Sequence, residues 1–304
     1  MAQVSRDPLW VDGKIFCANL LRGVATAKAQ EGKGHASGLL KHILQELLKE
    51  GQELSVLKTF IHPFYRKLGY EVYSRRSVRS LKPGHGKEGA VCGQYRTVAD
   101  IPPALLEQLV SRYRAYLQGR SGYLCRDSRY IRRMLEETLD FGGGLLLTFG
   151  APVEAYCIAY CGAEKLYAEE AVADEEHLQC FAQAAREMGR SFAYLDMDSP
   201  GEADAMIRAV NVKKLLEQTV MAGAVEGQAH IEVEDELLPE NCGVWQVRVE
   251  NGVVQAEKTQ RQAEARLSSG ELAVLCIGGT LSRELPGHIT RLWKRAKTGI
   301  FEQY

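Results

Sequence analysis

A glycine-rich turn near the start of the chain brings together several groups that could bind an anion. Gly32, Lys33, Gly34, His35 and Ser37 stand between a short apolar run and an amphipathic segment. The first N–H groups of a helix have no helical acceptor, and the helix dipole adds about half a positive charge there. Glycines allow an anion to approach that backbone closely. The turn therefore predicts a phosphate site; a strand-to-helix turn with a purely structural role is the open alternative.

The segment behind this turn is the clearest helix of the sequence. Its apolar residues recur at i, i+3, i+4 and i+7, and Gly51 stands where a helix C-cap belongs. Strands are expected before it, over residues 20–27, and after it, over residues 54–60. This strand-helix-strand order favours a right-handed crossover between parallel strands. The apolar face consists of Ala36, Leu39, Leu40, Ile43, Leu44, Leu47 and Leu48.

A turn-rich stretch, KPGHGKEGAVCG at residues 82–93, separates this first block from a second one. Its G-x-G-x-x-G letters, Gly84, Gly86 and Gly89, follow no apolar strand and open no amphipathic helix, so the stretch predicts a loop. The strand-to-helix junction of the second block, AVADEEHLQ, is acidic and would repel phosphate. Helices are expected at 103–117, 128–139 and 175–188, and strands near 144–149, 153–160, 165–172 and 191–195.

The last third of the chain has a different pattern. HIEVEDELL alternates apolar and charged residues as a half-buried strand does, and Asn251-Gly252 is a hairpin signal. Two short helices are expected in SSGELAVLCIGG and PGHITRLWKRAK. These features predict an α+β module from about residue 200 to the end.

Composition excludes several classes of partner. The formal net charge of -1 and a pI near 6.7 give no electrostatic footprint for nucleic acid or an anionic membrane. We find neither the apolar core of a signal peptide nor an apolar run long enough for a membrane span, so a cytoplasmic protein is expected. None of the eight cysteines is spaced C-x-x-C; they are interpreted as small buried hydrophobes, with no metal site.

The motifs around the turn resemble a known family. GVATAKAQEGKGHASGLL, followed by LSVLKTFIHPFYRKLGYEV, resembles the GNAT acetyltransferases, and within them the Eis-type (enhanced intracellular survival) proteins. MIRAVNVKKLLE resembles the segment that precedes their sterol-carrier-protein-like domain, and IEVEDELLPENCGVWQVRVENG resembles that domain itself. The resemblance implies an α+β fold with tandem GNAT-like domains. The expected domains are a truncated GNAT domain (1–84), a degenerate GNAT-like domain (85–200) and a sterol-carrier-protein-like domain (201–304).

The resemblance also implies a coenzyme site. Val24, Ala25 and Thr26 would pair through their backbone with the pantetheine arm of acetyl-CoA. The phosphate of the turn would then be the pyrophosphate of coenzyme A. Its binding residues would be Gly32, Lys33, Gly34, His35, Ala36 and Ser37.

By the same resemblance, two residues would carry the chemistry. Tyr65 in FYRKLGY falls on the family's general acid, and the terminal carboxylate of Tyr304 would be the general base. His62 and His35 are alternative bases. The implied function is acetyl-CoA-dependent N-acetyltransfer to a primary amine, aminoglycoside-like or a lysine side chain, by direct transfer. Relatives assemble from several subunits, so a homo-oligomer is expected.

Two departures from the family favour an alternative function. Glu31 is an acidic residue beside the expected pyrophosphate, which is unfavourable unless it points outward or pairs with Lys28 or Lys33. Only about 19 residues precede Leu20, so the walls of the acceptor pocket and the first strands of the sheet are expected to be missing, which would leave an unpaired edge. The alternative is a non-catalytic family member that acts as a binding or assembly protein.

Overall fold

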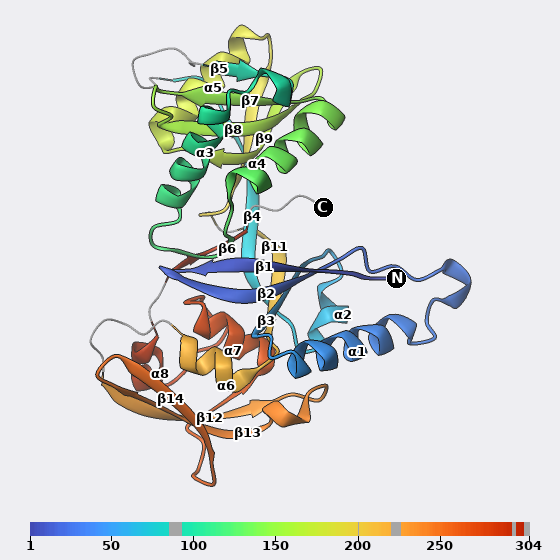
Figure 1. Ribbon diagram of the computed structural model, residues 1–304, viewed down its shortest axis with the longest axis vertical. Helices are drawn as coiled ribbons and strands as arrows, with labels where there is room; N and C mark the ends of the chain where they lie inside the picture. Colours follow the sequence, from blue (N-terminus) through green and yellow to red (C-terminus); the bar gives the residue numbers. More distant parts are fainter. Residues whose placement is uncertain (85–92, 200, 220–225, 294–295, 301–304) are drawn as a thin grey trace. The chain divides into compact units, whose positions relative to one another are not determined.

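The computed structural model describes residues 1–84, 93–199, 201–219, 226–293 and 296–300 (Figure 1). The chain forms two compact units. Unit 1 contains residues 1–75, 119–125 and 202–304, and unit 2 contains residues 76–118 and 126–201. Gly86, Gly89 and Tyr304 lie outside the described residues. Unit 1 joins the first expected domain to the last one, and the division into three domains stays a prediction.

The chain opens with an antiparallel hairpin that the sequence patterns did not predict. Strands β1 (Gln3–Val11) and β2 (Lys14–Arg22) pair along their whole length. The turn uses Asp12 and Gly13, whose φ angles are 42° and 97°. The strand expected over residues 20–27 is wrong at its end, because Gly23 has a φ of 56° and β2 stops at Arg22.

The expected crossover is confirmed. Helix α1 (His35–Lys49) joins β2 to β3 (Leu54–Lys58), and the two strands pair in parallel from Ala18–Leu54 to Leu21–Leu57. Short 3-10 helix η1 (Lys28–Gln30) precedes α1, and α2 (His62–Arg66) follows β3. Helices α1 and α2 share one core cluster, to which α1 contributes Leu40, Leu44 and Leu47 and α2 contributes Tyr65.

Strands from distant parts of the chain complete the sheet of unit 1. β6 (Arg120–Leu124) pairs with β1, and β11 (Glu202–Ala209) pairs with β3. The unpaired edge expected near Leu20 is therefore not observed: β2 lies between β1 and β3, and β6 covers the outer edge of β1. The strand order is β16 (Lys297–Thr298), β6, β1, β2, β3, β11 and the first residues of β4 (Glu71–Leu81).

A second, four-stranded sheet in unit 1 has the order β14-β13-β12-β15. The hairpin expected at Asn251-Gly252 is confirmed, with φ angles of 52° and 74°. The elements are α6 (Val212–Gln218), β12 (Gly227–Glu234), η4 (Pro239–Asn241), β13 (Gly243–Glu250), β14 (Val253–Thr259), β15 (Ala265–Ser268), α7 (Ser269–Cys276) and α8 (Gly287–Leu292).

A buried ion pair links β11 to the segment after β12. Arg208 of β11 is fully buried and pairs with Asp235, Nη2 to Oδ2, at 2.6 Å.

Unit 2 contains a second strand-helix-strand crossover, in which α5 joins the parallel strands β9 and β10. Its strand order begins with the last residues of β4 and continues β10-β9-β8-β7-β5. Every helix and strand expected here from sequence is present, although the helix expected over 128–139 becomes an α-helix followed by a π turn. The elements are β5 (Gly93–Tyr95), η2 (Val98–Asp100), α3 (Pro103–Tyr116), α4 (Ser128–Leu135), η3 (Glu136–Phe141), β7 (Gly144–Phe149), β8 (Ala155–Cys161), β9 (Lys165–Val172), α5 (Glu175–Glu187) and β10 (Ser191–Asp196).

Across the described ranges, the structure contains no helix long and apolar enough to cross a membrane.

Candidate active site

The start of α1 leaves several main-chain donors unpaired. Gly34 is the N-cap residue, with a φ of 80°, and no side chain caps the helix. The first helical bond joins the N–H of Gly38 to the carbonyl of Gly34 at 2.9 Å. The N–H groups of His35, Ala36 and Ser37 therefore have no acceptor within the helix. Because the positive end of the helix dipole lies at the same place, this helix start can bind an anion.

The glycines keep the approach to these donors open. A side-chain carbon placed on Gly32, Gly34 or Gly38 would meet no atom within 4 Å. Gly32 and Gly34 both have positive φ, 75° and 80°, a conformation that other residues adopt only with strain. The glycines at 32 and 34 therefore serve both the turn and the open approach to the backbone.

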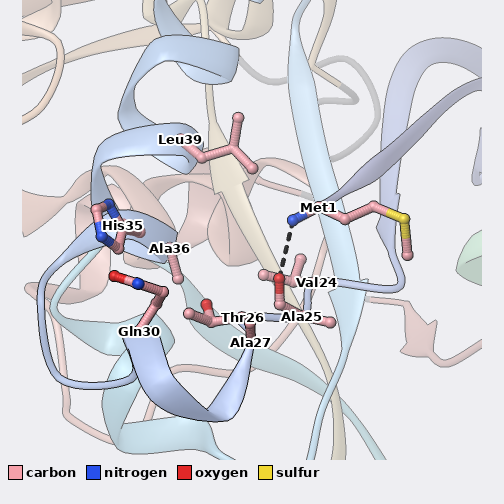
Figure 2. Close-up of a pocket in the computed structure, with 9 residues that line it drawn as sticks. All are labelled: Met1, Val24, Ala25, Thr26, Ala27, Gln30, His35, Ala36 and Leu39. Carbon is pink, nitrogen blue, oxygen red and sulfur yellow. Dashed lines mark hydrogen bonds between the residues drawn. The ribbon is translucent and has the colours of Figure 1, made fainter.

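A cavity of about 350 Å³ lies between the end of β2 and the first turns of α1. Figure 2 shows residues 24–27 on one side of it and His35, Ala36 and Leu39 of α1 on another, with Gln30 from η1 also lining it. Five of the cavity residues were expected from the sequence as binding residues. They are Val24, Ala25, Thr26, His35 and Ala36.

Main-chain groups beside the cavity are available for pairing. Both main-chain groups of Ala25 are hydrogen-bonded to Met1: the N–H donates to the Met1 carbonyl at 3.0 Å, and the carbonyl accepts from the Met1 nitrogen at 2.8 Å (Figure 2). Successive residues of an extended chain direct these groups to opposite edges. The groups of Val24 and Thr26 therefore face away from Met1, and we find no main-chain partner for them within the described ranges.

The pairing of β2 with β3 stops before these residues. The last residue pair between β2 and β3 is Leu21–Leu57, and β2 itself ends one residue later. An extended ligand could thus pair with the main-chain groups of Val24 and Thr26, just beyond the end of β2.

Charged side chains around the turn are exposed. The ammonium of Lys33 donates to the side-chain oxygen of Gln30 at 3.0 Å. Glu31 is exposed and does not line the cavity. The residues therefore fit a phosphate-bearing ligand with an extended arm: uncapped amides at the helix start would meet the anion, and the main-chain groups of Val24 and Thr26 would meet the arm.

The corresponding junction of unit 2 is closed by its own side chain. Asp174 caps α5, and its Oδ1 accepts from the His177 N–H at 3.0 Å and lies 2.6 Å from His177 Nδ1. Burial acts to raise the pKa of Asp174, but hydrogen bonds from His177 lower it on balance. A carboxylate in this place competes with any incoming anion, so of these two crossovers only that of unit 1 has a helix start open to phosphate.

Tyr65 is a buried residue of α2 that does not line the cavity. It is 8% exposed, and its ring packs edge-on against Phe64 at 4.9 Å and Tyr70 at 6.0 Å between centroids. Burial raises the pKa of the Tyr65 hydroxyl. It belongs to the same core cluster as Leu40 of α1, and Val24 packs against that cluster. The proposed acid and one cavity residue thus share a core.

The remaining expected site residues divide between those that the structure describes and one that it does not. Lys33 and Ser37 belong to the turn and the first turn of α1 but do not line the cavity. His62 begins α2. Tyr304, with its terminal carboxylate, lies outside the described residues.

Sequence reasoning missed four residues that line the cavity: Met1, Ala27, Gln30 and Leu39. Leu39 had a usable signal, because it lies four residues after His35 on one helix face. No local pattern pointed to the pairing of Met1 with Ala25 across the hairpin.

Comparison with known families agrees with this arrangement. Residues 4–73 match the acetyltransferase (GNAT) domain, and residues 212–288 match the sterol carrier protein domain. Two segments of the chain are thus similar to a GNAT acetyltransferase domain and to a sterol carrier protein domain. No curated protein sequence matches the chain.

Solved structures share the fold at low sequence identity. A probable N-acyltransferase from Enterococcus faecalis V583 is 17% identical with a TM-score of 0.84, over 100% of this chain and 85% of that one. A GCN5-related N-acetyltransferase from Anabaena variabilis is 21% identical with a TM-score of 0.81, over 100% and 86%. Eis1 from Mycobacterium abscessus is 15% identical with a TM-score of 0.73, over 100% and 87%.

Proposed function

We propose that this protein transfers the acetyl group of acetyl-CoA directly to a primary amine. The observation that carries the proposal is the uncapped start of α1 beside Val24 and Thr26, whose main-chain groups have no main-chain partner in the described part of the chain. A pyrophosphate bound by the amides of residues 35–37 would let the pantetheine arm run along Val24 and Thr26. Ala25 would position this edge through its bonds to Met1 rather than bind the arm.

The reaction needs one acid and one base. The amine nitrogen attacks the thioester carbonyl, a C–N bond forms, and the C–S bond breaks to release the coenzyme A thiolate. Tyr65 would donate a proton to that thiolate; its pKa is raised by burial, so the phenol remains protonated and available at neutral pH. The terminal carboxylate of Tyr304 would accept the proton that the amine loses.

Release of free thiol from acetyl-CoA in the presence of a primary amine tests the function. Thiol release that depends on the amine supports acetyl transfer, with the acetylated amine confirmed by mass spectrometry. Calorimetry with coenzyme A tests the alternative of a non-catalytic binding or assembly protein: no heat at millimolar ligand would contradict the enzyme proposal.

Two matched variants test the base. Extending the chain by two glycines after Tyr304 moves the terminal carboxylate and is expected to abolish thiol release. Tyr304→Phe keeps a terminal carboxylate in place and is expected to retain activity. Equal activity of the extended and unextended proteins would contradict the assignment of the terminal carboxylate as base.

A further inference from the structure

A short turn, residues 67–70, joins α2 to β4 and binds the main chain of Tyr65. The Tyr65 carbonyl accepts hydrogen bonds from the N–H of Leu68 at 2.9 Å and from the N–H of Tyr70 at 3.1 Å. Gly69 lies between these two donors and has a φ of 78°. The position of this α2–β4 turn therefore determines where the main chain of Tyr65 lies.

Arg208 of β11 binds the α2–β4 turn through its buried guanidinium. Its Nη1 donates to the carbonyl of Leu68, and its Nε donates to the carbonyl of Ala209 at 3.1 Å. The guanidinium also lies over the ring of Tyr70, 5.8 Å from the centroid. A hydrogen bond from a charged donor is stronger than one between neutral groups, so Arg208 holds the carbonyl of Leu68 in place.

Asp235, the residue after β12, fixes the orientation of Arg208. Its Oδ2 accepts from Arg208 Nη2 at 2.6 Å and from Asn241 Nδ2 at 2.9 Å. Its Oδ1 accepts from the N–H groups of Leu237 at 3.2 Å and Leu238 at 3.1 Å. Both carboxylate oxygens are thus bonded. Asp235 belongs to the segment that matches the sterol carrier protein domain, so this segment is linked through Arg208 to the α2–β4 turn.

The start of α7, in the same segment, contacts the α2–β4 turn at a second place. Gly270 is buried, and a side-chain carbon on it would lie 2.5 Å from the main-chain nitrogen of Glu71 and 2.7 Å from the carbonyl oxygen of Gly69. The hydroxyl of Ser269 donates to the same Gly69 carbonyl at 3.3 Å. Only a glycine at position 270 lets the helix approach the turn so closely.

We propose that Arg208 and Gly270 are positioning residues for the proposed general acid, Tyr65. Arg208 holds the carbonyl of Leu68, and Gly270 lets α7 pack on the α2–β4 turn. Together they place the phenol relative to the thiolate that it would protonate. The inference rests on the proposed acetyl transfer and gives the segment similar to a sterol carrier protein domain a part in it.

The test is a double-mutant cycle between Gly270→Ala and Tyr65→Phe in the thiol-release assay. Gly270→Ala alone pushes the α2–β4 turn away from α7. Because a displacement of 1 Å can cost catalysis 100-fold, kcat is expected to fall about 10- to 100-fold. The Kd for coenzyme A should not change, since the start of α1 is not altered. In the Tyr65→Phe protein the same substitution should lower kcat by less than about twofold, because no phenol remains to be displaced.

Gly144→Ala is the matched control. Gly144 is a buried glycine of β7 in unit 2, and a side-chain carbon on it would lie 2.8 Å from the carbonyl oxygen of Thr138. It should lower stability as Gly270→Ala does, measured by urea unfolding, and leave kcat unchanged.

Arg208→Lys is a second test variant that does not depend on the folding of Gly270→Ala. It keeps a positive charge facing Asp235 and removes the second guanidinium arm, which binds the carbonyl of Leu68. It is expected to lower kcat in the wild-type background and to have less than about a twofold effect in the Tyr65→Phe background.

Each contrary outcome has a distinct meaning. Equal losses of kcat in the wild-type and Tyr65→Phe backgrounds, or an unchanged kcat in folded variants, would overturn the positioning role and leave acetyl transfer standing. A wild-type kcat in Tyr65→Phe itself would remove the acid assignment and the inference with it. No thiol release with any amine would remove the proposed function as well.

Discussion

Gly34→Ala tests whether the start of α1 holds the coenzyme. The φ of Gly34 is 80°, a region that costs a residue with a side chain about 1–2 kcal/mol. A side-chain carbon at this position meets no atom within 4 Å, so no steric cost adds to the backbone cost. The variant is therefore expected to fold, with the free energy of unfolding lowered by about 1–2 kcal/mol.

The larger effect is expected on coenzyme binding. Relief of the backbone strain would turn the peptide that leads into α1 and misdirect the N–H groups of residues 35–37. A hydrogen bond to a charged group is worth about 1.5–3 kcal/mol, so loss of one such bond weakens binding roughly 10- to 150-fold. Calorimetry with coenzyme A measures this Kd directly, and urea unfolding measures the stability.

Gly13→Ala provides the matched control. Gly13 has a φ of 97° in the β1–β2 turn, and a side-chain carbon there also meets no atom within 4 Å. Both variants should lose similar stability, and only Gly34→Ala should lose affinity for coenzyme A. If the Kd of Gly34→Ala stays within about twofold of the wild-type value, the helix start is not the phosphate site and the assignment of the cavity is wrong.

Three further predictions concern single side chains. Tyr65→Phe is expected to lower kcat about 100-fold or more without changing the Kd for coenzyme A. Because burial raises the pKa of this phenol, the wild-type rate should fall only at strongly alkaline pH, and the variant should lack that fall. An unchanged kcat contradicts the role of Tyr65 as acid. Burial acts to raise the pKa of Glu264, but hydrogen bonds from two histidines lower it on balance. The Glu264 carboxylate therefore stabilises the fold above its unfolded-state pKa, and this contribution is lost as pH falls through its folded-state pKa. Glu264→Gln should lower Tm at neutral pH and have the Tm of the wild type in acid, whereas the exposed control Glu257→Gln should not show this pH dependence. Asp235→Ala leaves the fully buried charge of Arg208 unpaired and is expected to cost about 3–5 kcal/mol in urea unfolding, and a cost below about 1 kcal/mol would contradict the ion-pair argument.

Local sequence patterns predicted those elements of the fold whose conformation depends on residues close together in the sequence. Helix α1 has a complete apolar face, and Asn251-Gly252 adopts the positive φ angles that its residue types favour. The first strand was missed because most of its side chains are exposed or half-buried and only Leu9 and Val11 are buried, so little apolar alternation is visible.

The site was predictable as a turn and not as a cavity. The glycine spacing indicated the helix start correctly. The end of β2 at Arg22 depends on the positive φ of Gly23, and the residues around Gly23 favour a strand, so the sequence did not indicate this break. Pairing of β6 with β1, and of β11 with β3, joins residues separated by more than a hundred positions. Such long-range pairing is set by the packing of the whole unit, so no short window of sequence records it.

The position of β11 has a consequence for biosynthesis. Strand β3 emerges from the ribosome early, but its partner at residues 202–209 follows only after all of unit 2 has been made. At ordinary elongation speeds the intervening segment takes on the order of 10 s. During that interval the nascent chain exposes an open strand edge, and a trigger-factor-like chaperone that shields it would be expected to improve the yield of native protein.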